Sequence, residues 1–489
     1  MHKDPSGERP DTRAVVKRML GQTDRHALAS IVKFFAGITL GLLAYFLPEW
    51  LGWQSFESLS PAGRVTLGIM IGAAFLWVTE AIPAFAVGVL VIAVEIAVLG
   101  KPGGVYAAEG DNKAWTEFVG AWSSSIMWLF LGGFVLAQAA SKTRLDQWMA
   151  SRILGVFGKN PAYLLASTMA VTFVFSMFMS NTATAAMMIT VAAPVLSVIP
   201  KNHSFGRSFI LSVPVAANLG GIATIIGTPP NAIAVGSLSE NLRPDFIQWM
   251  AYGLPPALLL ASLAYLYLFL SGKKDGLHFQ LGTFQSTDAP PTKDENKQRF
   301  IVAAVLLTTV LAWMTESLHN IPAPVVSFLP ITAFAVTGVL ASDDMRNLPW
   351  DVLLLLAGGI SLGGAVKATG LAAWIGSQVP ASLPLIGIII VISLIGVVMS
   401  NLMSNTATAS ILVPVGIGIV ASHSENAPAM LAIPLAIACS CAMCLPISTP
   451  PNAVALASGK VQSRDFMKIG LIMAAIGPVV GIVWLQLVL

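Results

Sequence analysis

The chain has 489 residues, of which 55% are hydrophobic and 10% are charged, with a formal net charge of +3. Ordinary soluble domains carry about 25% charged residues, so this composition predicts an all-helical, polytopic membrane protein. The small net charge gives no indication of a nucleic-acid partner, and three cysteines, all within 439–444, do not make a disulfide framework.

In chain order, residues 1–33 come first, as a polar and basic segment without the apolar core of a secretory signal peptide. Apolar runs long enough to cross a bilayer, about 20 residues, then recur along the chain. The predicted spans are 34–52 (with a loop to 63), 64–82, 83–100, 120–141, 207–238, 247–271, 300–316, 324–340, 350–366, 428–458 and 467–488. We therefore expect about eleven transmembrane helices, with a polar linker at 272–299.

Two further apolar stretches, 161–200 and 384–421, are interrupted near the middle by Ser-Asn-Thr. Basic residues accumulate in cytoplasmic loops, which distinguishes hairpins from single spans here. If both stretches enter and leave by one face, the basic segments 1–33 and 272–299 lie together on the cytoplasmic side. If both crossed instead, the linker would face outward. The charge pattern therefore favours two re-entrant hairpins, a cytoplasmic N-terminus and an external C-terminus in a bacterial inner membrane.

Four short sequences recur in the same order in the two halves of the chain, at nearly constant spacing. They are Trp77-Val78-Thr79-Glu80 with Trp313-Met314-Thr315-Glu316, Gly132-Gly133 with Gly358-Gly359, Ser180-Asn181-Thr182-Ala183-Thr184-Ala185 with Ser404-Asn405-Thr406-Ala407-Thr408-Ala409, and Thr228-Pro229-Pro230-Asn231-Ala232 with Thr449-Pro450-Pro451-Asn452-Ala453. The repeats 64–271 and 300–489 each hold about five spans, and an odd number turns the second copy upside down. Inverted repeats of this kind are typical of secondary transporters, which bind substrate where discontinuous helices meet.

Each repeat thus contributes one hairpin tip and one broken helix. Ser-Asn-Thr interrupts the hairpins 161–200 and 384–421. Thr-Pro-Pro-Asn interrupts the spans 207–238 and 428–458. Unwound backbone at membrane depth persists only where it is buried in protein or lines a cavity. Helix N-termini at such a break favour anions. Hydroxyl, amide and freed carbonyl oxygens, including those of Gly227 and Ile447, suit a hard cation such as Na⁺.

Charged side chains are absent from the two motifs. No Lys, Arg or His lies in either Ser-Asn-Thr hairpin or either Thr-Pro-Pro-Asn break. A substrate dianion there would lack a fixed positive partner, so we infer that mobile cations balance it, which favours sodium coupling. Acids inside the membrane are functional candidates. However, Glu80 and Glu316 fall at span ends and are expected to be structural caps, and Glu95 is expected near the external interface.

These motifs resemble those of the divalent anion:sodium symporter family, from about residue 34 to the end of the chain. In that family hairpin tips and broken helices bind a carboxylate between two sodium sites, and homodimers move substrate by an elevator motion. The resemblance implies one sodium site of Ser176, Ser180, Asn181 and Gly227 and a second of Ser400, Asn405, Ala407 and Ile447. It implies substrate contacts from Ser180, Asn181, Thr182, Thr228, Ser404, Asn405, Thr406 and Thr449. The second copy departs from the first by reading Ile-Ser-Thr at 447–449 where the first reads Ile-Gly-Thr at 226–228.

The sequence therefore predicts an elevator-type symporter that brings sodium and a small di- or tricarboxylate into the cell, with succinate, malate, fumarate and citrate as candidate substrates. A sodium-independent dicarboxylate exchanger is the alternative, because the family contains exchangers; a sulfate transporter and an anion channel lined by the polar tips are further ones. Membrane lipid and a second copy in a homodimer are the expected partners. No enzymatic activity is expected, because the motif region lacks a catalytic carboxylate pair or metal-ligand cluster.

Overall fold

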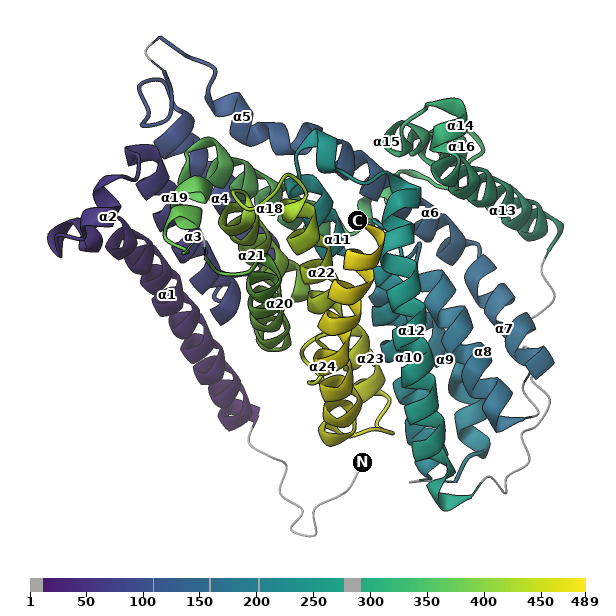
Figure 1. Cartoon of the computed structure of the whole chain (residues 1–489). Coiled ribbons are helices and arrows are strands. Elements are labelled where there is room, and N and C mark those ends of the chain that lie inside the picture. Colours follow the sequence, from purple (N-terminus) through teal and green to yellow (C-terminus); the bar gives the residue numbers. More distant parts are fainter. Residues whose placement is uncertain (1–11, 109, 158–159, 201–202, 277–291, 381) are drawn as a thin grey trace.

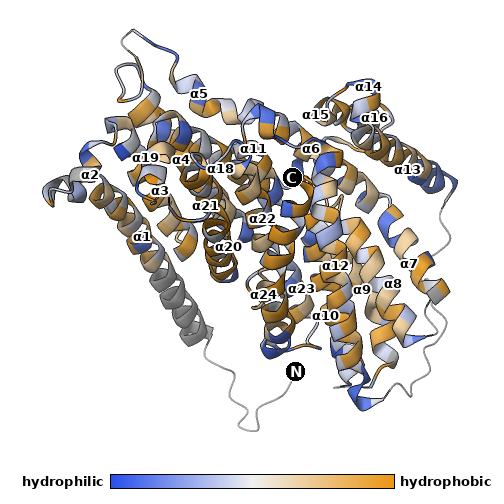
Figure 2. Ribbon diagram, viewed as in Figure 1, coloured by the Kyte–Doolittle hydropathy of each residue, from blue (hydrophilic) through white to orange (hydrophobic). Residues whose placement is uncertain are grey.

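The computed structural model describes residues 12–108, 110–157, 160–200, 203–276, 292–380 and 382–489. Throughout this part of the chain the regular elements are helices, and nine of them are long and apolar enough to cross a membrane. Figure 2 shows that apolar residues cover the middle of the helices and polar residues gather at their ends. The predicted all-helical class is confirmed; residues 1–11 and most of the 272–299 linker lie outside the described residues.

The first half of the chain contains the helices that precede the linker. In order they are α1 (Thr12–Trp50), α2 (Gln54–Glu57), α3 (Pro61–Thr79), α4 (Ala84–Val94), the π-helical turn η1 (Glu95–Gly100), α5 (Trp115–Val119), η2 (Gly120–Ser123), α6 (Ser125–Lys142), α7 (Leu145–Phe157), α8 (Pro161–Ser176), α9 (Asn181–Val198), α10 (Ser204–Ile222), α11 (Pro229–Ser237), η3 (Glu240–Leu242) and α12 (Phe246–Gly272). Helix α1 begins well before residue 34, so much of the expected N-terminal segment is continuous with the first helix.

The second half repeats this order after the linker. Its helices are α13 (Lys293–Met314), α14 (Glu316–His319), α15 (Ala323–Val326), α16 (Phe328–Val336), α17 (Ser342–Arg346), α18 (Trp350–Ala368), α19 (Leu371–Ser377), α20 (Leu385–Leu402), α21 (Asn405–Val420), α22 (Ala427–Ser440), α23 (Pro450–Ala457) and α24 (Ser463–Val488). The range 324–340, expected as one span, is divided at Ser327 into α15 and α16.

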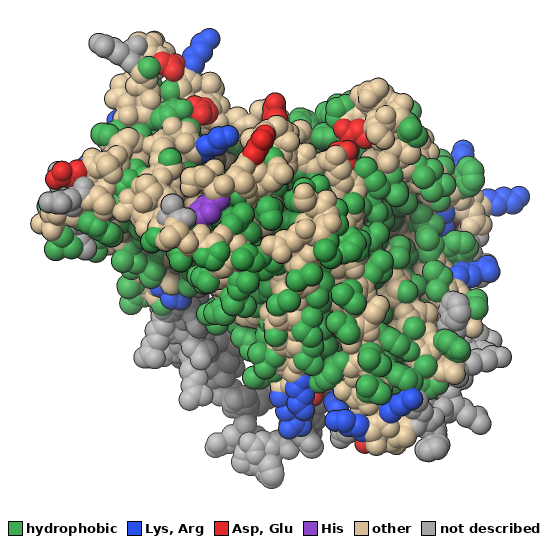
Figure 3. Space-filling view, in the orientation of Figure 1, with side chains coloured by type: hydrophobic (Ala, Val, Ile, Leu, Met, Phe, Trp, Pro, Cys, Tyr) green, Lys and Arg blue, Asp and Glu red, His purple; other side chains and the backbone are tan. Residues whose placement is uncertain are grey.

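Equivalent helices of the two halves run in opposite directions. In Figure 1, α10 rises from the lower edge to a break that α11 continues, whereas α22 descends from the upper edge to a break that α23 continues. Figure 3 shows Lys and Arg mainly along the lower and right edges, and Asp and Glu along the upper edge. The described N-terminal end of α1 and the C-terminal end of α24 lie at opposite edges.

The repeated Trp-containing motif ends a helix in the same way in both halves. The Trp77 indole N–H donates to the Ala84 carbonyl at 3.1 Å, and the Trp313 indole N–H donates to the Ala323 carbonyl at 3.0 Å. Glu316 accepts a hydrogen bond from the Ala323 N–H at 3.0 Å, which confirms its predicted role as a cap. Each indole therefore fixes the turn between two helices.

The repeated glycine pairs mark the crossings between halves. A Cβ on Gly358 of α18 would lie 2.3 Å from the Gly88 Cα of α4, and a Cβ on Gly132 of α6 would lie 2.5 Å from the Ser327 Cβ. Such distances leave no room for a side chain. Small residues at helix crossings let the two backbones approach this closely in membranes. Each half thus packs one helix against the other half through the first glycine of its pair.

Candidate functional site

The first Ser-Asn-Thr motif closes the hairpin of α8 and α9 onto the end of α10. Ser176 Oγ donates to the Ala217 carbonyl O at 2.7 Å and lies 2.6 Å from the Asn181 carboxamide. The same carboxamide atom lies 3.1 Å from Gly227 O and 3.2 Å from Ala217 O. If this atom is Nδ2, these three oxygens share its two N–H groups. If it is Oδ1, it lies within 3.2 Å of three other oxygens, and a hard cation, which takes oxygen ligands, would relieve their mutual repulsion.

The second motif repeats this arrangement with the corresponding residues. Ser400 Oγ lies 2.6 Å from Asn405 Oδ1 and 3.0 Å from the Cys439 carbonyl O. A serine hydroxyl carries one proton, yet in this cluster it faces two acceptors. We define the Ser176–Asn181 group as cluster 1 and the Ser400–Asn405 group as cluster 2.

Glycine makes the close approach in cluster 1 feasible. A Cβ on Gly221 would lie 2.7 Å from Asn181 Oδ1, and a Cβ on Gly227 would lie 2.4 Å from the Gly221 carbonyl O. The break between α10 and α11 is therefore folded tightly against the hairpin tip. A larger residue at either position would push the hairpin away from the carbonyl oxygens.

The asparagine of Thr-Pro-Pro-Asn stabilises each break from the inside. Asn231 Nδ2 donates to Gly221 O at 2.9 Å and to Thr224 O at 2.8 Å, and Asn452 Nδ2 donates to Met443 O at 3.0 Å and Leu445 O at 2.9 Å. Carbonyls freed by unwinding need such partners at membrane depth. The two prolines before each asparagine occupy the first helical positions, where a missing N–H costs little, so α11 and α23 begin there.

The two halves meet at this site. Asn218 Nδ2 of α10 donates to Thr449 Oγ1, the residue before α23, at 3.1 Å. Helix α9 packs against α23, and α21 packs against α11. Each hairpin therefore contacts the broken helix of the other half. The N-termini of α9 and α21 begin at the two clusters, and helix N-termini carry partial positive charge.

The structure brings together only part of the predicted residue set. Ser176, Asn181 and Gly227 meet in cluster 1, and Ser400 and Asn405 meet in cluster 2. Ser180 and Ser404 precede α9 and α21 as N-cap residues, with Ser404 Oγ accepting from the Ala407 N–H at 3.2 Å.

Ala407 and Ile447 are predicted to contribute carbonyl ligands to the second sodium site. Ala407 lies in the first turn of α21, two residues after Asn405, and Ile447, which is 80% exposed, lies in the break between α22 and α23.

The predicted substrate contacts differ in burial. Thr182 and Thr406, the second residues of α9 and α21, are half-buried, and Thr228 and Thr449 are buried.

Several polar partners had no signal in the motifs. The carbonyls of Ala217 and Cys439 belong to apolar helix segments, and only the helix crossing brings them to the serines. Asn218 could have been noticed as an amide within an apolar helix. Asn401 accepts from the Cys444 N–H at 2.8 Å and lies 3.2 Å from Ser448 Oγ, and the first half has Met177 at the corresponding place.

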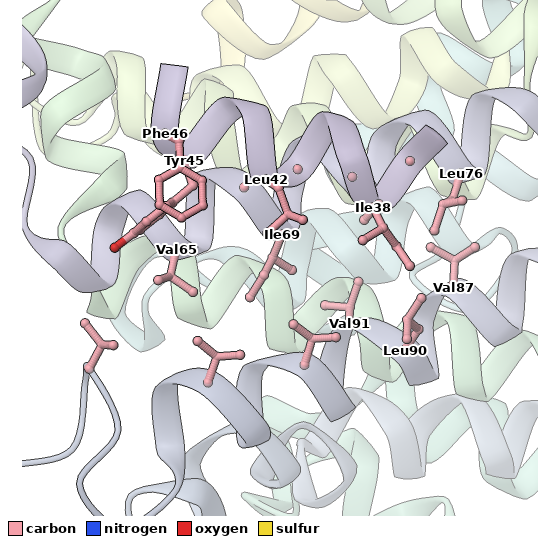
Figure 4. A pocket seen from close by; sticks show the side chains of 18 residues that line it. Ile38, Leu42, Tyr45, Phe46, Val65, Ile69, Leu76, Val87, Leu90 and Val91 are labelled. Atoms are coloured by element: carbon pink, nitrogen blue, oxygen red, sulfur yellow. The ribbon is translucent and has the colours of Figure 1, made fainter. Parts of the chain in front are cut away.

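The most apolar cavity lies elsewhere. Figure 4 shows Ile38 and Leu42 of α1, Ile69 of α3 and Leu90 of α4 around a space of about 440 Å³ that has no charged side chain in its lining. A second cavity, of about 580 Å³, lies between α5, the end of α11 and α18, and its lining includes polar and charged side chains beside apolar ones. Neither is lined by residues of clusters 1 or 2.

Comparison with known proteins gives relatives over most of the chain. The sequence profile described as "Citrate transporter" (CitMHS) matches residues 67–428. The chain is 28% identical over 471 residues to the sodium-dependent dicarboxylate transporter SdcS of Staphylococcus saprophyticus, covering 89% of this chain and 87% of that protein. SdcS of Staphylococcus aureus (strain bovine RF122) is also 28% identical, over 484 residues, covering 89% and 88%.

Two solved structures share the fold. The YdaH transporter of Alcanivorax borkumensis superposes with a TM-score of 0.55 at 13% identity, covering 83% of this chain and 98% of that one. MtrF of Neisseria gonorrhoeae, described as an antimetabolite efflux pump, superposes with a TM-score of 0.51 at 13% identity, covering 82% and 94%. The expected kinship with carboxylate transporters, rather than enzymes, is confirmed: this chain belongs to the citrate transporter family.

Proposed function

We propose that this chain is a secondary active transporter that carries a small di- or tricarboxylate into the cell together with sodium ions. The observation that carries the proposal is the recurrence of one oxygen cluster in both halves, at a hairpin tip and a broken helix. Citrate transporter kinship and relatives named as sodium-dependent dicarboxylate transporters support the same ligand chemistry.

Sodium would bind at clusters 1 and 2. In cluster 1, rotation of the Asn181 carboxamide exchanges a donor for an acceptor, so Oδ1 joins Ser176 Oγ and the carbonyls of Ala217 and Gly227 around a cation. In cluster 2, a cation relieves the competition of Asn405 Oδ1 and Cys439 O for the single Ser400 proton. Ser180 and the carbonyls near Ala407 and Ile447 remain predicted additional ligands.

The carboxylate would bind between the clusters. The predicted contacts are the hydroxyls and amides of the two Ser-Asn-Thr motifs with Thr228 and Thr449, at the N-termini of α9 and α21. Those N-termini offer unpaired N–H groups to an anion. Because no basic side chain lies in these elements, the two bound cations supply the balancing charge. Substrate affinity would therefore depend on sodium, which is the differential binding that coupling requires.

Movement would separate a transport domain from a scaffold. We infer that α8–α9 and α20–α21 are re-entrant hairpins, entering from opposite faces, and that they move with α10–α11 and α22–α23 as an elevator. The second glycine of each pair supports this division. A Cβ on Gly133 would lie 3.1 Å from the Ile226 Cδ1, and one on Gly359 would lie 2.5 Å from Ser410 Oγ. Helices α6 and α18 thus present bare backbone to the proposed moving elements.

We assign the lower edge in Figure 3, where Lys and Arg gather, to the cytoplasm, because basic residues accumulate in cytoplasmic loops. This places the N-terminus inside, the C-terminus outside and the linker 272–299 in the cytoplasm of a bacterial cell. The repeats would span 64–271 and 300–489, and two copies would form a homodimer through the scaffold.

The experiment is radiolabelled succinate uptake into proteoliposomes, with an inward sodium gradient or with choline replacing sodium. Uptake that requires the gradient is the expected result. Equal uptake without sodium, but only into vesicles preloaded with dicarboxylate, would identify an exchanger and overturn the sodium sites. If succinate is not taken up, citrate and then sulfate are tested under the same gradient. The proposal is overturned if sodium drives uptake of neither carboxylate, whether or not it drives uptake of sulfate.

A further inference from the structure

Glu95 is a buried acid outside clusters 1 and 2. It begins the π-helical turn η1 directly after α4, and its side chain is fully buried in the protein. The same turn carries Leu99, which is part of a buried apolar cluster with Ala62, Phe118 and Ala365. π-Helical turns often occur at functional sites, and acids within membrane segments are costly and usually functional.

The two contacts of the Ser361 hydroxyl can both be hydrogen bonds when Glu95 is protonated. Ser361 Oγ lies 3.0 Å from the Phe118 carbonyl O and in direct contact with Glu95 Oε2. The hydroxyl has one proton, and the carbonyl can only accept. When Ser361 donates to Phe118, the contact with Glu95 therefore needs a proton on the carboxyl group. A protonated Glu95 donates to Ser361 Oγ, and both contacts become hydrogen bonds.

An ionised Glu95 would lack charge compensation. Within the described residues, Glu95 forms no ion pair, and its Oε1 has no hydrogen-bond partner. The titratable groups on the elements packed around it make other contacts or lie at element ends: they are Arg64 of α3 over the Phe56 ring, Glu117 of α5 with Tyr106, and Asp351 and Lys367 of α18. The polar atoms that meet here are Glu95 Oε2, Ser361 Oγ and Phe118 O, and none of them carries a positive charge that would balance an ionised carboxylate.

A polar cavity gives this carboxyl group a route to solvent. Ser361 lines the space of about 580 Å³ between α5, the end of α11 and α18. Exposed Glu117 and Lys367 are part of the same lining. A proton can therefore reach Glu95 through Ser361 without crossing the apolar core.

We propose that Glu95 is a proton-binding site, loaded with a proton in this packing and exchanging it through Ser361 and the polar cavity. This goes beyond sodium-coupled transport. Helix α18 packs on one side against α4 and on the other against α11 and α21. Loss of the proton would leave a buried, unpaired charge, which displaces α18 from α4. Because α21, which carries Asn405 of cluster 2, packs against α18, its position would then change with pH.

Infrared spectroscopy of the purified full-length protein tests the protonation itself, without reference to any substrate. The wild type is expected to show the C=O band of a protonated carboxylic acid at neutral pH, absent in Glu95→Gln and retained in Glu117→Gln, whose acid is exposed in the same cavity. Ser361→Ala is expected to keep the band and shift its frequency, because a hydrogen bond to the carboxyl group is lost. A wild-type spectrum equal to that of Glu95→Gln would overturn the proposal.

The consequence for transport is tested by succinate uptake at fixed sodium over neutral to alkaline pH, where succinate stays a dianion. Wild-type uptake is expected to fall with rising pH, by about tenfold per pH unit in the range where Glu95 is mostly ionised and must regain its proton. Glu95→Gln is expected to match the wild type at neutral pH and to stay level, while Glu117→Gln follows the wild type. Parallel pH profiles of the wild type and Glu95→Gln would overturn the link to transport.

Discussion

The two halves build the same cluster but bury its surroundings differently. In the first half the whole break from Gly221 to Thr228 is buried, and Thr224 Oγ1 donates to the Met177 carbonyl. In the second half the break carries an exposed Ile447, and Ser448 takes over the contact to the tip, donating to the Asn401 carbonyl at 3.1 Å. Identical motifs thus sit in one closed and one more open break.

Under the proposed transport mechanism, a difference of this kind between the two inverted repeats is expected. Equivalent elements that face opposite sides of the membrane cannot both be open at once if transport is to be coupled. The polar residues Asn401 and Ser448 hold the second break where its surroundings are less buried, whereas glycines suffice in the closed first break. The two breaks therefore differ in their amino-acid side chains as well as in their exposure.

The largest effect is expected from the motif asparagines. Asn181→Ala and Asn405→Ala each remove a carboxamide that contacts a serine and approaches carbonyls across the hairpin, worth about 3 kcal/mol or about 100-fold in uptake. Sodium-driven succinate uptake measures this loss, with the exposed Asn241→Ala as the control. Full uptake by either motif variant would break the proposed equivalence of the two clusters.

Packing between the halves is expected to be equally sensitive in both. Gly358→Ala places a Cβ 2.3 Å from the Gly88 backbone and Gly132→Ala one 2.5 Å from Ser327, so each should lower stability by about 1–3 kcal/mol. Gly364→Ala, in the same helix α18 with open space around it, should be neutral or stabilise by about 0.5–1 kcal/mol. Thermal unfolding of the purified variants measures both. A stable Gly358→Ala protein would show that α4 and α18 are not in contact.

Thiol labelling sharpens the contrast in burial. In a Cys444→Ser background, Ile447→Cys should react with a membrane-impermeant thiol reagent about tenfold or more faster than Ile226→Cys, because exposure controls thiol reactivity. Ile447 is 80% exposed and Ile226 is 6% exposed, while the remaining Cys439 and Cys441 are buried. Equal labelling rates would mean that the two breaks are equally open.

The smallest effect is expected at an ion pair between the halves. Lys142 Nζ of α6 lies 2.5 Å from Asp344 Oδ2 of α17. Partial burial opposes ionisation, but hydrogen bonds from Lys142 and the Ala341 N–H outweigh it and lower the pKa of Asp344. The stabilisation is therefore present above the ordinary carboxyl pKa of 3.8 and is lost as pH falls through the lowered value. We expect less than about 1 kcal/mol for such a pair.

Comparison of Asp344→Asn with the wild type in thermal unfolding from neutral to acid pH checks this. The difference should vanish at the acid end. Asp343→Asn is the control, since that carboxylate pairs with Arg346 on the surface at 85% exposure. A difference that grows on acidification would contradict the assignment.

Sequence repetition pointed to the polar side chains of this candidate site but not to the backbone carbonyls that they contact. The doubled motifs identified Ser176, Asn181 and Asn405 because polar residues in apolar stretches are conspicuous. Backbone carbonyls carry no such signature, so Ala217 and Cys439 emerged only from the crossing of α8 with α10 and of α20 with α22. Burial of Glu95 was missed for the same reason, because the serine that contacts it lies in the other half of the chain.

The most direct measurement is the sodium dependence of succinate uptake in proteoliposomes containing the wild type, Ser176→Ala or Ser400→Ala. We expect a sigmoidal sodium curve for the wild type and a half-saturating sodium concentration raised about tenfold in each variant, because each variant loses a ligand worth about 1.4 kcal/mol. Ser167→Ala and Ser393→Ala, buried serines of the same two helices outside the clusters, should follow the wild type. A wild-type rate independent of sodium, or variants with unchanged sodium dependence, would contradict the assignment of sodium to the two Ser–Asn clusters.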